Sequence, residues 1–117
     1  GLADRVEETL CRQQAESGGL QVAFAPKPWP VIVGRHFAID VVVCAPPGGP
    51  APDALRVDAD MPAHRHGMNY RAGVKPLGDG RFVAEGLMFH MPGRWRFIFD
   101  VGSGAQPVRV TREVDVE

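Results

Sequence analysis

The sequence predicts an all-β domain: an immunoglobulin-like β-sandwich of about seven strands with a short helix at its N-terminal end. From residue 20 onward, apolar and polar residues alternate over short segments, which is the period of a strand with one buried face. Turn-forming residues, 14 glycines and 11 prolines, separate these segments at short intervals. The length of 117 residues suits one domain and leaves no room for a second core.

Residues 2–16 are expected to form the helix. One narrow apolar stripe with the helical period runs along it: Leu2, Val6 and Leu10. A pair of glycines at 18 and 19 ends the segment. Because so thin a stripe does not stabilise a free helix, we expect residues 1–19 to pack on a sandwich formed by residues 20–117.

Strand-length alternation is clearest in residues 37–43, 55–61, 95–101 and 108–116. In the third of these segments, Trp95, Phe97 and Phe99 share one face, which we expect to point into the core.

Turn signals predict how the later strands connect. Asp79-Gly80 is a favoured pair for a tight hairpin turn with positive φ. Residues 91–94 (MPGR) place proline and glycine where a type II turn requires them. Together they predict a meander of strands near residues 69–77, 81–90 and 94–101.

The two cysteines, Cys11 and Cys44, predict a disulfide between the helix and the sandwich. It would close a loop of about 33 residues and stabilise the fold by about 3–4 kcal/mol. No C-x-x-C or Cys/His spacing suggests another use for these thiols. The alternative is a pair of buried, reduced thiols in a cytosolic protein.

Charge and motifs exclude several function classes. A formal net charge of −1 gives no electrostatic footprint for nucleic acid or an anionic membrane surface. No apolar run approaches the roughly 20 residues that span a bilayer. A Ser/His/Asp arrangement, a glycine-rich phosphate loop, a haem-attachment motif and paired carboxylates are all missing, so we expect no enzymatic activity. Since Gly1 is not an initiator methionine, we expect that a signal or anchor segment has been removed.

Histidine and methionine are concentrated in two short segments. All four methionines and three of the four histidines lie within residues 60–69 and 88–91. A two-residue turn at 79–80 would place Met68 opposite Met91 and Asn69 opposite His90. A bulge would shift this register by one or two residues. The strand over 55–61 ends at the same pole, so six side chains are expected to converge there: Met61, His64, His66, Met68, His90 and Met91.

This donor set favours copper. Imidazole suits copper, zinc and nickel, whereas a thioether selects the soft cuprous ion. With no thiolate and only Asp60 as a nearby carboxylate, the set is a poor match for zinc. An extended chain would also project His64, His66 and Met68 from one face. An open position at a solvent-facing pole would suit transfer of the ion better than catalysis.

Structural roles for the same residues remain open at this point. Met61 and Met88 could fill the core, and His90 could cap a turn. His64 and His66 could belong to a solvated loop, and His36 is expected to face away from the cluster.

The motifs in this region resemble a known family. They are Asp60-Met61-Pro62-x-His64-x-His66-Gly67-Met68, Gly78-Asp79-Gly80-Arg81-Phe82 and Phe89-His90-Met91-Pro92-Gly93-x-Trp95. Over about residues 35–103 the chain resembles the YtkA-like and FixH-like domains, small extracytoplasmic β-sandwich domains of bacteria. The resemblance implies an immunoglobulin-like fold, copper handling or respiratory-oxidase assembly, and the same six His and Met residues. It does not extend to the helix or to Cys11, and the transmembrane helix of FixH-like members has no counterpart in this chain.

Two functions are therefore expected as alternatives. The first is a periplasmic copper-binding domain that handles the ion or delivers it to a periplasmic or membrane protein. The second is an adaptor that docks a protein partner, for example in respiratory-oxidase assembly, without binding a metal.

Overall fold

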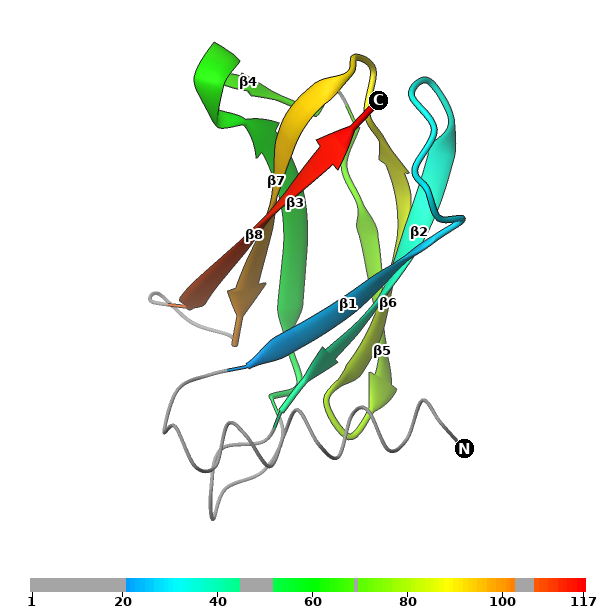
Figure 1. Cartoon of the computed structure of the whole chain (residues 1–117). Helices are drawn as coiled ribbons and strands as arrows, with labels where there is room; N and C mark the ends of the chain where they lie inside the picture. Colours follow the sequence, from blue (N-terminus) through cyan, green and yellow to red (C-terminus); the bar gives the residue numbers. More distant parts are fainter. Residues whose placement is uncertain (1–20, 45–51, 69, 103–106) are drawn as a thin grey trace.

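The computed structural model describes residues 21–44, 52–68, 70–102 and 107–117. In this part of the chain, eight strands form two antiparallel four-stranded sheets that pack face to face (Figure 1). The predicted all-β sandwich is thus confirmed, with eight strands instead of about seven. The predicted helix at 2–16 and Cys11 lie outside the described residues. No helix in the described ranges is long and apolar enough to cross a membrane.

The first sheet has the strand order β1-β2-β6-β5. Its members are β1 (Val22–Lys27), β2 (His36–Val43), β6 (Arg81–Met88) and β5 (Gly73–Gly78). The alternation in β2 buries every second side chain, from Phe37 to Val43, against the other sheet.

The second sheet has the order β4-β3-β7-β8. Its members are β3 (Leu55–Met61), β4 (His66–Gly67), β7 (Gly93–Val101) and β8 (Val108–Val116). A single 3₁₀ turn, η1 (Pro62–His64), joins β3 to β4. Trp95, Phe97 and Phe99 of β7 are fully buried, which confirms that this aromatic face points into the core.

The division of strands between the sheets is that of immunoglobulin-like sandwiches. Strands 1, 2, 5 and 6 form one sheet, and strands 3, 4, 7 and 8 form the other. The β4–β5 and β6–β7 connections therefore both cross from one sheet to the other, and both begin at the same pole (Figure 1).

The predicted meander is correct for its first hairpin only. Asp79 and Gly80 have φ of 55° and 77°, as the tight turn between β5 and β6 requires. Strands β6 and β7, however, belong to different sheets, because residues 89–92 cross the sandwich.

The predicted pairing of Met68 with Met91 is also wrong. Strand β5 begins only at Gly73, and the amide of Met68 donates instead to the carbonyl of Ala59 on β3, at 3.2 Å. Asn69, expected opposite His90, lies outside the described residues.

Cys44 follows the last residue of β2 and is buried. Its amide donates to the carbonyl of Gln21, at 3.2 Å. Because Cys11 lies outside the described residues, the disulfide between them stays a prediction.

Candidate metal centre

Two histidines from separate elements meet at the pole where the crossing connections begin. His66 lies on the two-residue strand β4, and His90 lies in the β6–β7 connection (Figure 1). Their Nε2 atoms are 2.5 Å apart, and their rings meet edge to face with centroids 4.6 Å apart. If both rings are neutral, one Nε2 donates and the other accepts.

The two rings differ in their surroundings. His66 is exposed, whereas His90 is half-buried. The Nδ1 atom of His90 is buried and has no hydrogen-bond partner among the described residues. A buried polar atom without a partner costs about 1–3 kcal/mol.

Met61 lies on β3, next to the strand that carries His66. The two residues are cross-strand partners at the end of β3 and the start of β4, so their side chains point to the same face. Met61 is only 1% exposed, and its terminal methyl reaches the start of β7. A Cβ at Gly93 would lie 2.6 Å from Met61 Cε, and Gly93 has a φ of 134°. Glycine at 93 therefore leaves the space that the thioether occupies.

Trp95 underlies the connection that carries His90. The indole is fully buried, stacks on Phe89 and meets the His90 ring edge to face. Trp95 thus belongs both to the core and to the surroundings of the histidine pair.

Among the described residues, no hydrogen bond, ion pair or ring contact links the remaining candidate ligands to the pair. His64 ends η1 and makes no hydrogen bond, ion pair or ring contact with any residue that the structure describes. Because η1 is a 3₁₀ turn and Arg65 is left-handed with φ of 49°, the expected one-face projection of His64, His66 and Met68 is wrong. Met68 and Met91 are half-buried and pack against the core.

His36 and Met88 form a separate pair at the same pole. They are cross-strand partners of β2 and β6. The neighbouring partners Phe37 and Leu87 are buried, so His36 and Met88 point to the outer face of the first sheet. The His36 ring contacts Tyr70 edge to face, at 5.0 Å, and makes no ring contact with His66 or His90.

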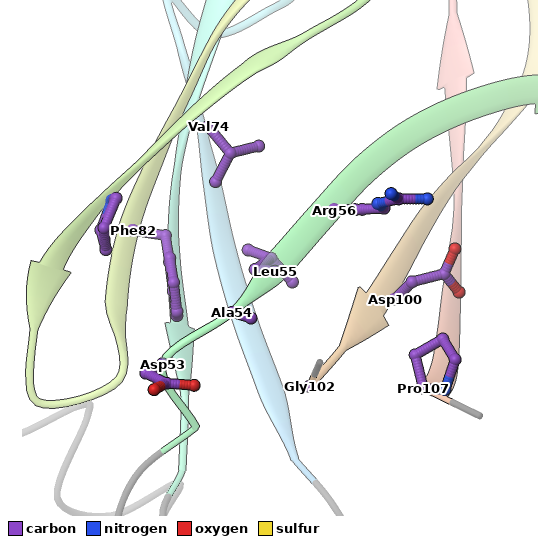
Figure 2. A pocket seen from close by; sticks show the side chains of 10 residues that line it. Asp53, Ala54, Leu55, Arg56, Val74, Phe82, Asp100, Gly102 and Pro107 are labelled. Carbon is purple, nitrogen blue, oxygen red and sulfur yellow. The ribbon is translucent and has the colours of Figure 1, made fainter. Parts of the chain in front are cut away.

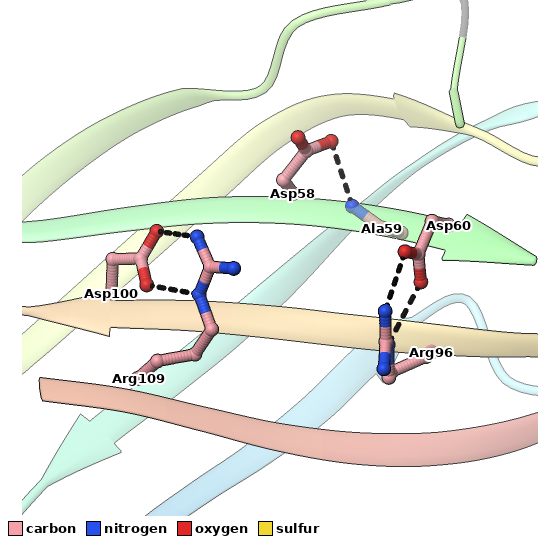
Figure 3. A network of polar contacts seen from close by, with 6 residues as sticks. All are labelled: Asp58, Ala59, Asp60, Arg96, Asp100 and Arg109. Atoms are coloured by element: carbon pink, nitrogen blue, oxygen red, sulfur yellow. Dashed lines mark hydrogen bonds and ion pairs between the residues drawn. The ribbon is translucent and has the colours of Figure 1, made fainter. Parts of the chain in front are cut away.

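Asp60 is held by an arginine on the outer face of the second sheet (Figure 3). Arg96 donates two hydrogen bonds to Asp60, of 2.9 and 2.7 Å, and this bonding raises the pKa of the guanidinium. At the far end of the same face, Arg109 donates two hydrogen bonds to Asp100 and lowers the pKa of that carboxyl. Within the described ranges, no group of three or more His, Cys, Asp or Glu side chains could hold a metal ion. A metal at this pole would therefore depend on imidazole together with thioether.

The opposite pole holds a cavity of about 550 Å³ between the edges of the two sheets (Figure 2). Its lining includes Leu55, Val74 and Phe82 beside the charged Arg56 and Asp100. None of the predicted ligands lies there.

No protein-family model, curated protein or solved structure matches the chain. The resemblance to YtkA-like and FixH-like domains therefore stays a prediction. Sequence reasoning gave Gly93 a role in a turn and in the resemblance but none at the site, although its position two residues after Met91 in the M-P-G-x-W motif is the signal that links it there.

Proposed function

We propose that this domain binds one copper ion at the pole, with His66 and His90 as nitrogen ligands and Met61 as a thioether ligand. The observation that carries this proposal is the approach of the two Nε2 atoms to 2.5 Å, from elements 24 residues apart in the sequence. The space left by Gly93 around the Met61 methyl supports it.

The geometry requires only a small adjustment. Metal–imidazole bonds of about 2.0–2.1 Å at a tetrahedral angle would separate the two nitrogens by about 3.3 Å. The rings would therefore have to part by a little under 1 Å. His66 is the ring able to move, since it is exposed and lies on a strand of only two residues.

The donor set favours the cuprous ion. Two imidazoles and a thioether form a soft, uncharged set, and thioether sulfur selects Cu(I) among the common metals. Asp60, the residue before Met61, points to the other face of β3 and is held by Arg96. Exposure of His66 leaves the ion open on one side, which suits its handling or delivery to a periplasmic or membrane protein.

Removing either histidine should abolish tight copper binding. We expect one cuprous ion per wild-type chain, and an affinity lowered by more than about 100-fold in His66→Ala and in His90→Ala, because each loses a ligand and not just an outer-shell partner. Competition with a chromophoric cuprous chelator measures this.

His64→Ala and His36→Ala are the matched controls, since both remove an imidazole at the same pole and neither residue contacts the pair. Equal losses in all four variants would contradict the proposed ligands. A wild-type chain that takes up no copper would favour the adaptor function instead.

Replacing the thioether should separate the two oxidation states. Met61→Leu nearly conserves volume in the core, so we expect it to weaken cuprous binding while changing cupric binding little. Met88→Leu is the control, because Met88 is a half-buried methionine on the outer face of the other sheet. If Met61→Leu and Met88→Leu bind Cu(I) equally well, Met61 is not a ligand.

A further inference from the structure

We infer that Trp95 is the positioning residue of this site: its indole holds the β6–β7 connection in the conformation that presents His90. This inference rests on the proposed copper function. Trp95 is not a ligand in it and acts only through His90.

Trp95 contacts three consecutive residues of the connection. Its ring stacks on Phe89, with centroids 4.4 Å apart and planes 18° apart. It meets the His90 ring edge to face at 5.5 Å, with planes 81° apart. Its Nε1 donates a hydrogen bond of 2.9 Å to the carbonyl of Met91. One rigid, fully buried side chain therefore fixes the residues before, at and after the proposed ligand.

The connection needs such an anchor because it lies outside the sheets. Residues 89–92 belong to no strand, so no β-ladder sets their backbone. At its start, the Phe89 carbonyl accepts a hydrogen bond of 2.8 Å from the amide of Gly34. Beyond His90, the backbone is held by the hydrogen bond that Trp95 donates to the Met91 carbonyl, because no neighbouring strand in the described part of the chain bonds it.

His90 also lacks the usual means of orientation. In metal sites, the second ring nitrogen of a ligating histidine almost always bonds a carboxylate, carbonyl or water, which fixes the ring. The Nδ1 atom of His90 has no such partner among the described residues. The His90 ring is therefore oriented by its packing against Trp95 and by the hydrogen bond that anchors the neighbouring Met91 carbonyl.

Trp95→Phe tests this role, since phenylalanine keeps a buried aromatic ring but has no N–H for Met91. We expect its cuprous affinity to fall by roughly 10–100-fold, the range for loss of an outer-shell partner. Phe99→Leu is the matched control: it trims a fully buried ring on the same face of β7 that contacts the rings of Phe24 and Phe97 and makes no ring contact with Phe89 or His90. Its affinity should stay within about twofold of wild type. Equal affinities in the two variants would overturn the inference.

A measurement on the wild-type chain decides the question even if Trp95→Phe does not fold. The chain has two tryptophans, and Trp29 is 63% exposed in the β1–β2 loop. Saturation with the diamagnetic cuprous ion should shift the indole N–H resonance of Trp95 and leave that of Trp29 in place. Copper binding without a shift at Trp95 would refute the positioning role alone, whereas absence of copper binding would refute the proposed function and this inference with it.

Discussion

Trp95→Ala should leave the domain unfolded, or barely folded, at ambient temperature. The side chain is fully buried, stacks on Phe89 and donates a hydrogen bond to the Met91 carbonyl. Truncating a buried tryptophan costs about 3–5 kcal/mol through lost burial and the cavity left behind. A small domain has a total stability of only about 5–15 kcal/mol. Urea unfolding followed by circular dichroism measures the loss.

Trp29→Ala is the matched control, because Trp29 is 63% exposed. Substitutions at such surface positions usually change stability by no more than about 0.5 kcal/mol. If Trp95→Ala melts within a few degrees of wild type, Trp95 contributes little to the core.

Much of the fold follows from local patterns that packing does not alter. Alternation in β2, β3 and β7 gave the buried faces, because residues two apart on a strand always share a face. The turn at Asp79-Gly80 was predictable because its positive φ values favour these two residue types.

The assignment of strands to sheets did not follow from these patterns. Alternation shows which side chains of a strand are buried, but it does not show which other strand is its hydrogen-bonded neighbour. The expected pairing of β6 with β7 was therefore wrong. A bulge adds to the difficulty: the β2–β6 register shifts between Phe37 and Ile39, and Gly86 has φ of 81°. This shift of phase turns Leu87 and Phe89 toward the core, where Phe89 begins the crossing to β7.

The histidine pair shows the same limit at the site. The clustering of histidine and methionine in two segments identified His66 and His90 as candidates, and the structure does bring them together. They meet because β4 pairs with β3 while the β6–β7 connection crosses above the core, not through the expected hairpin register. The 3₁₀ turn that separates His64 from this arrangement depends on Pro62 and on left-handed Arg65, whose residue type does not predict positive φ.

Gly93→Ala should be strongly destabilising, and a change at Met61 should partly reverse the effect. A Cβ at position 93 would lie 2.6 Å from Met61 Cε, and the backbone there has φ of 134°. Overpacking a core costs about 1–3 kcal/mol, and holding a side chain at such a φ costs about 1–3 kcal/mol more. We therefore expect a loss of about 2–6 kcal/mol in the free energy of unfolding.

The part of this loss that comes from the clash should disappear when the methyl group is removed. Leucine at 61 ends one atom earlier than methionine, so Met61→Leu/Gly93→Ala should be more stable than the sum of the two single changes predicts. A coupling of about 1–2 kcal/mol is expected between contacting residues, measured by urea unfolding of wild type, both single variants and the double variant. Gly73→Ala controls for glycine replacement as such, since a Cβ there would meet nothing within 4 Å. Strict additivity across the four proteins would mean that Met61 does not fill the space beside Gly93, and the thioether would then have no defined place at this pole.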